Sequence, residues 1–147
     1  MKTLLFILVA GCFAFAIFST LKQKSLLRRL REGHFGPFEV SSYDETAEGI
    51  VAFDLKQRKV ALLGVRVPVF HGKYTVTHHI TMNIFFGFEQ IDKIAVGQPG
   101  QMSAGTAVFR FREEVPPGNL DKALWVNGNA GILPKLIQQT FPPDLIL

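Results

Sequence analysis

Two adjacent histidines, His78 and His79, come nearest in this chain to a metal-binding or catalytic pair. They lie in residues 74–86, YTVTHHITMNIFF, where apolar and polar residues alternate. Alternation predicts a β-strand, and successive side chains of a strand point to opposite faces. We therefore expect His78 at the edge of the core among apolar neighbours, and His79 in solvent among threonines. Without a bulge the two cannot bind one metal ion together, so the doublet does not predict a metal site.

The other residues that could do chemistry form no recognisable site. His34 and His71 lie in glycine-containing turns, with no cysteine or carboxylate at ligand spacing. Glu113 and Glu114 are adjacent near a predicted strand end, so their carboxylates point apart. The glycine-rich residues 97–105 lack the lysine and the following helix of a phosphate-binding loop. We expect no catalytic residues, no cofactor and no metal; a hydrolase site built from distant loops is the weakest alternative.

The charge of the chain is concentrated near its N-terminus. The net charge is +4, but residues 33–147 hold ten Lys or Arg against eleven Asp or Glu. A nucleic-acid binder needs its cations on the face that meets phosphate, so the distribution argues against a nucleic-acid partner. The one cysteine, Cys12, excludes an intramolecular disulfide framework and a multi-cysteine zinc site.

Residues 3–21, TLLFILVAGCFAFAIFSTL, form an uncharged apolar run near the N-terminus. At 1.5 Å per residue a helix of this length spans roughly 28 Å, close to the hydrocarbon thickness of a bilayer. The run therefore predicts a single membrane-spanning helix. The side chains that we expect to contact lipid include Leu4, Leu5, Phe6, Phe13, Phe15 and Phe18.

Two processing signals compete with a retained anchor. The small-x-small pattern that ends at Ala16 is typical of a cleaved signal peptide. The segment LVAGC resembles a lipobox, with Cys12 as the lipidated residue. The apolar run continues past both positions and stops only at Lys22, which favours retention as an anchor.

A basic segment follows the apolar run. Its cations are Lys22, Lys24, Arg28, Arg29 and Arg31. Leucines at helical spacing indicate that the helix continues through residues 21–32, and Gly33, Gly36 and Pro37 predict its end. The cations either set the topology of the span or bind anionic lipid head groups. More positive charges follow the apolar run than precede it, which favours a cytoplasmic location for the rest of the chain. Against this, an N-terminal Met-Lys before an apolar run is also common in exported proteins.

Residues 33–147 have the pattern of a β-rich domain, separate from the anchor and basic helix of residues 1–32. Strands are predicted in residues 48–55, 59–70, 74–86, 103–112 and 122–127, with a short helix from Leu133 to about Phe141. Pro68 predicts that the strand in residues 59–70 lies at a sheet edge or contains a bend. Strands in succession without intervening helices predict antiparallel pairing in a small barrel or sandwich.

Several aromatic residues lie near predicted turns or strand ends, where polar residues are usual. Phe35, Phe38, Phe85 and Trp125 are the candidates for exposed aromatics that dock onto another protein or the membrane. The alternative is that they close the open ends of the β-structure.

These patterns favour a non-catalytic, single-pass membrane protein. Its β-domain would act as an accessory or scaffolding subunit that docks onto a larger membrane assembly, for example a respiratory, photosynthetic or secretion complex. The partners would be membrane lipid and other subunits. The alternative is an exported or lipid-tethered β-barrel whose aromatics line a cavity for a hydrophobic ligand.

Overall fold

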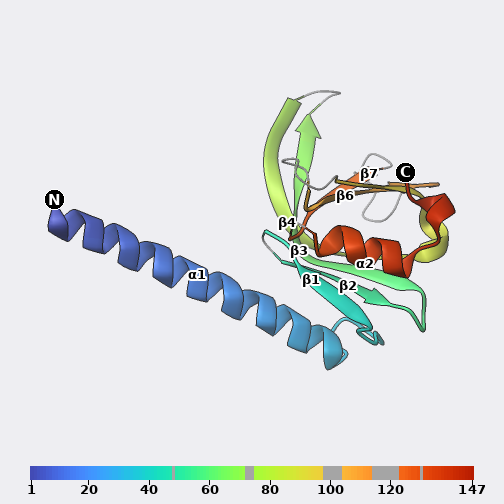
Figure 1. The fold of residues 1–147 in the computed structure, drawn as a ribbon, viewed down its shortest axis with the longest axis horizontal. Coiled ribbons are helices and arrows are strands. Elements are labelled where there is room, and N and C mark those ends of the chain that lie inside the picture. Colours follow the sequence, from blue (N-terminus) through green and yellow to red (C-terminus); the bar gives the residue numbers. More distant parts are fainter. Residues whose placement is uncertain (48, 72–74, 98–103, 114–122, 130) are drawn as a thin grey trace.

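The computed structural model describes residues 1–47, 49–71, 75–97, 104–113, 123–129 and 131–147. In this part of the chain a long helix precedes two sets of strands and a short helix (Figure 1). The helices are α1 (Lys2–Arg31) and α2 (Leu133–Thr140), with 3-10 turns η1 (Phe88–Gln90) and η2 (Pro143–Leu145). The strands are β1 (Ser42–Glu45), β2 (Ile50–Asp54), β3 (Lys59–His71), β4 (Thr75–Gly87), β5 (Ile91–Val96), β6 (Thr106–Phe111) and β7 (Ala123–Asn127).

The strands form two antiparallel sheets, in the orders β1-β2-β3-β4 and β5-β6-β7. One isolated bridge, Thr46 to Gly128, joins the end of β1 to the end of β7. The sheets do not close into a barrel, so the sandwich is the predicted architecture that fits. The mainly β prediction is confirmed, and so are the N-terminal helix and the short C-terminal helix.

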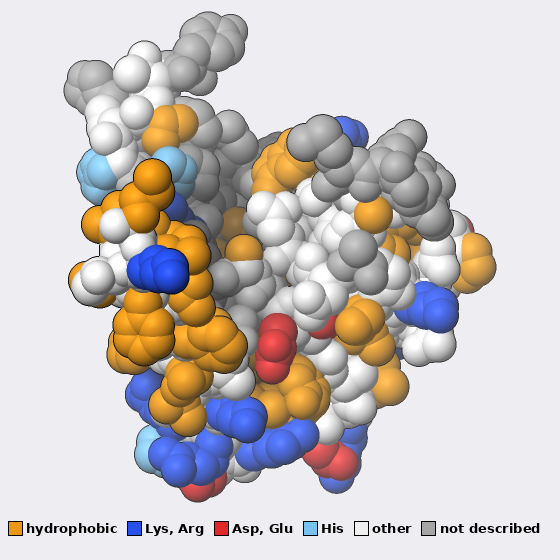
Figure 2. Space-filling model, turned by 60° about the vertical axis from the view of Figure 1, so that its left-hand side comes forward, with side chains coloured by type: hydrophobic (Ala, Val, Ile, Leu, Met, Phe, Trp, Pro, Cys, Tyr) orange, Lys and Arg blue, Asp and Glu red, His pale blue; other side chains and the backbone are white. Residues whose placement is uncertain are grey.

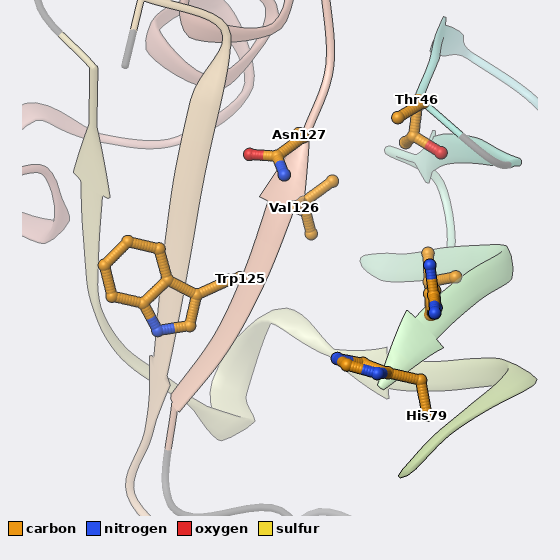
Figure 3. A pocket seen from close by; sticks show the side chains of 8 residues that line it. Thr46, His79, Trp125, Val126 and Asn127 are labelled. Atoms are coloured by element: carbon orange, nitrogen blue, oxygen red, sulfur yellow. The ribbon is translucent and has the colours of Figure 1, made fainter. Parts of the chain in front are cut away.

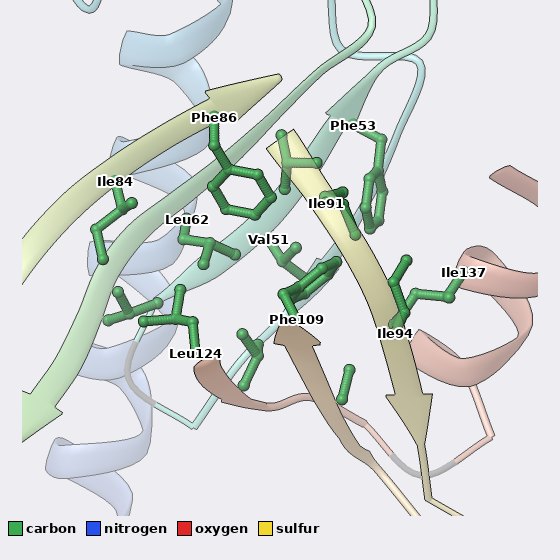
Figure 4. Close-up of a cluster of buried hydrophobic side chains, with 14 of the residues drawn as sticks. Val51, Phe53, Leu62, Ile84, Phe86, Ile91, Ile94, Phe109, Leu124 and Ile137 are labelled. Carbon is green, nitrogen blue, oxygen red and sulfur yellow. The ribbon is translucent and has the colours of Figure 1, made fainter. Parts of the chain in front are cut away.

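The main core lies between the two sheets, and α2 contributes to one side of it (Figure 4). Its fully buried side chains include Phe53, Leu62, Ile84, Ile91, Ile94, Phe109, Leu133 and Ile137. Phe141, just after α2, meets Phe53 edge to face, with ring centroids 5.9 Å apart. Each such side chain stabilises the fold by about 1.5–3 kcal/mol relative to an exposed position.

Strand β2 is buried on both faces, which the sequence pattern did not predict. Val51 and Phe53 face the main core, whereas Ile50 and Ala52 belong to a second cluster on the outer face of the first sheet. The last third of α1 covers that cluster with Leu27 and Leu30. The strand was predicted to run to Leu55, but Leu55 lies beyond its observed end and is 51% exposed.

Strands β3 and β4 form a long hairpin whose outer part projects from the sandwich (Figure 1). A bulge between Leu62 and Val65 contains Gly64, which has a φ of +67° and donates its N–H to Asn83 Oδ1 at 2.9 Å. A left-handed φ suits glycine, which has no Cβ to clash. Strand β2 pairs with Lys59–Leu63 of β3, and no other strand in the described part of the chain pairs with β3 at Pro68 on that side, which agrees with the edge prediction.

Candidate functional site

The apolar part of α1 is fully exposed and projects from the domain. The six predicted lipid-contacting side chains of Leu4, Leu5, Phe6, Phe13, Phe15 and Phe18 are 65–76% exposed. Figure 2 shows hydrophobic side chains gathered over the projecting helix on the left, with Lys and Arg side chains below them. The mean hydropathy reaches 2.5 over an 18-residue window, none of which is buried. The chain thus has one N-terminal helix that is long and apolar enough to cross a membrane, a test that a signal sequence also passes.

The arginines of the basic segment contact residues that follow the helix. The Arg29 guanidinium lies 4.9 Å from the Phe35 ring centroid, and that of Arg31 lies 5.8 Å from the Tyr43 ring centroid. Such cation–π contacts are worth about 0.5–1 kcal/mol at exposed sites. Arg28 is 4.0 Å from the Glu32 carboxylate, an exposed pair of small energetic weight.

The basic segment also lies in the last turns of α1, where cations interact favourably with the negative end of the helix dipole. Lys22 and Lys24 are exposed one residue either side of Gln23. The cations that we predicted to contact lipid head groups are therefore on the surface, with two of the arginines held against rings. Their role in lipid binding or topology stays a prediction.

A buried glutamine joins α1 to the domain. Gln23 is 8% exposed, and its Nε2 donates to the carbonyl oxygen of Thr46 at 2.9 Å and to that of Gly49 at 3.4 Å. These carbonyls belong to the β1–β2 turn, which Thr46 also closes by accepting from the Gly49 N–H at 2.8 Å. Gln23, Leu27 and Leu30 share one helix face, so polar and apolar contacts act together. The end of α1 and the β-strands are thus packed together, and the predicted boundary after residue 32 stays an interpretation.

Three of the predicted docking aromatics pack against one another near the end of α1. The rings of Phe35 and Phe38 lie 6.0 Å and 6.4 Å from that of Phe85, and all three are half-buried against the second cluster. They line a groove of about 330 Å³ together with Arg58 and Lys59. These three rings pack against the outer face of the first sheet. A docking role for them stays a prediction.

Trp125, the fourth predicted docking aromatic, is 71% exposed on β7. It lies on the outer face of the second sheet, where its cross-strand neighbour is Val108, which in turn pairs with Ala95. Val108 and Ala95 are half-buried. We define the outer face of the second sheet by these three residues. The outer face of the first sheet is covered by α1; among the described residues no element covers this one.

The histidine doublet lies in the projecting hairpin, and both residues are exposed. The expectation that His78 lies at the core edge is wrong. Its face of β4 does carry apolar residues, but the second sheet does not extend over it, and Val76 and Ile80 are 43% and 41% exposed there. His78 Nδ1 lies 3.0 Å from Thr77 Oγ1. His79, on the other face, turns toward β7.

A cleft of about 210 Å³ lies between the hairpin and the free edge of β7 (Figure 3). Figure 3 shows His79 pointing toward β7 from β4, the Trp125 ring on the far side of β7, and Thr46 and Asn127 toward one end. The lining residues are Thr46, Ala47, Val65, Arg66, His79, Trp125, Val126 and Asn127. None of these eight is acidic. Arg66 is the one residue of fixed charge among these eight, and it already takes part in another interaction.

The remaining candidates are not brought together. No group of three or more His, Cys, Asp or Glu side chains that could hold a metal occurs in the described part of the chain. His34 Nε2 lies 3.1 Å from the Glu32 carboxylate at the surface, and Cys12 is exposed on α1. Glu114, residues 98–103 and the side chain of His71 lie outside the described residues.

Comparisons with family models, curated proteins and solved structures find no match to this chain. Its function is therefore argued from its own geometry.

Sequence reasoning missed the polar residues that organise this region. Gln23 could have been found, because it stands four and seven residues before Leu27 and Leu30 and so shares their face. Arg66, Thr46 and Asn127 come together only through the bridge between β1 and β7 and the bulge in β3. Neither feature has a signal in residue spacing.

Proposed function

We propose that this chain is a non-catalytic, single-pass membrane protein whose β-domain docks onto a larger membrane assembly through the outer face of its second sheet. The observation that carries the proposal is Trp125, 71% exposed beside Val108 on that face. Exposed tryptophans in apolar surroundings are the residues that most often dominate binding energy at protein interfaces. The occupant would be another protein chain of the same membrane.

The packed contact between α1 and the domain at Gln23 supports this role. Because α1 packs onto the first sheet, that sheet faces the helix. The second sheet then faces away from the helix and is the one available to a partner. An accessory subunit gains from such preorganisation, since less orientational freedom is lost on binding. The basic segment favours a cytoplasmic location for the domain.

The alternative, a carrier of a hydrophobic ligand, has less support. The space between the sheets is filled by packed side chains (Figure 4), and the two clefts at Trp125 and at Phe85 open at the surface. A carrier would need an enclosed apolar cavity to exclude water from its ligand.

Co-purification in mild detergent tests the docking proposal. The tagged full chain should retain partner proteins, and a Val108→Glu variant should lose them, because a charge at the centre of the face cannot be desolvated. The matched control is Leu55→Glu, at a position that is 51% exposed just beyond the end of β2, which should keep the partners. Thermal unfolding checks that both variants fold.

Three other outcomes would change the assignment. If Val108→Glu retains the partners while neutralising Arg28, Arg29 and Arg31 releases them, the basic segment is the partner site. If removal of Phe35 and Phe38 alone releases them, the groove beside Phe85 is the site. If only a second copy of the chain is recovered, the face is a homodimer interface.

A further inference from the structure

The outer edge of β4 lacks the features that usually protect a sheet edge. β4 is the last strand of the first sheet, and no strand in the described part of the chain pairs with it on the side away from β3. Exposed edge strands are usually short, or carry charges or proline, because their unpaired N–H and C=O groups recruit other strands. β4 has 13 residues and contains no Asp, Glu, Lys, Arg or Pro.

The neighbouring edges do carry such features. β3 has Arg66 and Pro68 in the part that extends beyond its pairing with β2. The edge of β5 is covered by the C-terminal residues, because Ile94 forms a bridge with Ile146 and its carbonyl oxygen accepts from the Leu147 N–H at 2.8 Å. Within the described residues β4 has neither protection, so we expect a surface outside the chain to cover it.

Gln23 places the β1–β2 turn close to the membrane surface. If residues 3–21 cross the hydrocarbon core, Gln23 lies two residues beyond its edge, or about 3 Å along the helix axis. Its Nε2 donates to the carbonyl oxygen of Thr46 at 2.9 Å. The head-group layer extends about 5–7 Å beyond the hydrocarbon on each side. The turn that holds Thr46 therefore lies in or next to the head-group layer.

The outer part of the β3–β4 hairpin lies beside that turn. Val65 of β3 and His79 of β4 line one cleft with Thr46. Figure 1 shows the outer hairpin running across the direction of α1, with β4 on the side of the apolar N-terminal part of the helix. β4 is therefore the hairpin strand nearer to a bilayer that α1 crosses.

The side chains of the outer part of β4 suit a membrane surface. Residues 75–81 are all exposed, and the two aliphatic ones, Val76 and Ile80, are 43% and 41% exposed. The other five are threonines and histidines, whose side chains can hydrogen-bond with water and with lipid head groups. This stretch has no carboxylate that lipid phosphates would repel.

We propose that the outer part of β4, residues 75–81, lies in the head-group layer of the membrane that α1 spans, with Val76 and Ile80 as its apolar contacts to lipid. The inference rests on the retained anchor of the proposed function, because the anchor sets the depth. Backbone N–H and C=O groups find no partners in hydrocarbon, so an unpaired strand edge stops at the head groups, where water is available. The lipid surface then covers the unprotected edge and holds the domain at a second point besides α1.

Spin labels on single cysteines test the depth of β4. Because Cys12 is the only cysteine, Ile80→Cys in a Cys12→Ser background gives one label on β4. The full chain is reconstituted into phosphatidylcholine vesicles at a low ratio of protein to lipid. The measurement compares collisions of the label with oxygen, which enters lipid, and with a water-soluble nickel chelate.

Two reference positions give the scale. A label on the native Cys12 reports the hydrocarbon core. A label at Leu55→Cys reports water, because Leu55 is 51% exposed just beyond β2, which ends away from the apolar part of α1 (Figure 1). We expect the ratio of oxygen to nickel collisions at Ile80→Cys to lie between these two. A ratio equal to that of Leu55→Cys would overturn the inference.

A pair of substitutions assigns the contact to the two aliphatic residues. With the label at His78→Cys in the Cys12→Ser background, Val76→Ser and Ile80→Ser together should shift the ratio to the water value. Leu55→Ser is the matched control and should leave the ratio unchanged. Thermal unfolding in the same vesicles checks that each variant folds. An unchanged ratio in the folded double variant would overturn the role of Val76 and Ile80.

The remaining outcomes separate this inference from the proposed function. If the label on Cys12 meets the nickel chelate as freely as that at Leu55→Cys, residues 3–21 do not span the bilayer and both proposals fail. A shielded Cys12 with a water-exposed Ile80→Cys overturns only the lipid contact of β4 and leaves the docking proposal intact.

Two further results would assign the edge of β4 to a protein. Spin–spin broadening at Ile80→Cys that disappears on dilution with unlabelled chain indicates pairing with a second copy. Shielding of this label in native membranes but not in pure phosphatidylcholine indicates a strand of another protein. Either result overturns the lipid contact.

Discussion

Gln23 Nε2 lies 2.9 Å from the carbonyl oxygen of Thr46, a buried hydrogen bond between the N-terminal helix and the β1–β2 turn. A buried carbonyl that loses its partner costs about 1–3 kcal/mol. We therefore expect Gln23→Met, which keeps the length of the side chain, to destabilise the protein by that amount in denaturant unfolding. Lys24→Met, one residue away and exposed, is the control and should change stability by less than about 0.5 kcal/mol. Equal effects would show that the helix does not pack on the domain.

Gly49 allows the same turn to approach β3. A Cβ built on Gly49 would lie 1.8 Å from the carbonyl oxygen of Leu63, a backbone atom that cannot rotate away. We expect Gly49→Ala to destabilise the fold by about 2 kcal/mol or more, since the backbone must shift. Gly11→Ala, where nothing lies within 4 Å, is the matched control. Thermal unfolding of the two variants in the same detergent makes the comparison.

Asp44 is a buried carboxylate that ties β1 to the segment after β7. Its oxygens accept from the N–H of Glu45 and from both the backbone N–H and the Nδ2 of Asn129, each at 2.9 Å. Replacement by asparagine puts an NH₂ group against these donors, so we expect Asp44→Asn to cost about 2–3 kcal/mol in denaturant unfolding. Glu45→Gln, on the exposed face of β1, should be almost neutral. A neutral Asp44→Asn variant would contradict the described network.

The histidines offer a test of where the sandwich ends. Both His78 and His79 are exposed, so alanine at either position should change the free energy of unfolding by less than about 0.5 kcal/mol. The pattern of the sequence alone predicted a loss of stability for His78→Ala. Measured stabilities of the two variants decide between an exposed and a packed hairpin. A bound stoichiometric metal lost in both variants would contradict the strand register.

The retained anchor has its own test in the mature protein. We expect the N-terminal peptide to begin at Met1 or Lys2 by mass spectrometry, and the protein to resist extraction by alkaline carbonate. A mature N-terminus at Ile17, or a lipid-modified Cys12, would instead assign residues 3–21 to a processed signal.

The sequence predicted those elements whose apolar period is regular. The hairpin strands and α2 were found nearly at their observed bounds: β4 from its alternation, β3 from its β-branched residues, and α2 from the prolines in its first turn and after its end. Strand β1, Ser42–Glu45, was missed because its buried position holds Asp44, which is satisfied by Asn129 from 85 residues away. Strand β5 was missed because a register shift between Ile91 and Lys93 spaces its buried residues by three.

The parts of the candidate site were less predictable than the strands. Trp125 was one of four aromatics that the sequence made candidates for exposure, and of the four it is the one that is exposed. The half-burial of Phe35 and Phe38 was not predicted. It depends on the chain turning back after α1 at Gly33, where φ is +80°, so that both rings reach Phe85. Arg66 and His79 line one cleft with Trp125 although they come from different sheets, a relationship that local spacing does not encode.

The tie between Asp44 and Asn129 has a consequence for synthesis of the chain. A nascent polypeptide releases α1 first and the strands of the first sheet afterwards, so both emerge before the end of the second sheet. The carboxylate of Asp44, however, has no Asn129 to meet until the ribosome has translated nearly the whole chain. During that interval the inner face of the first sheet, with Phe53 and Ile84, is exposed to its surroundings. An N-terminal segment already held in the bilayer would keep such half-made chains apart, and so limit their aggregation while the second sheet is still being translated.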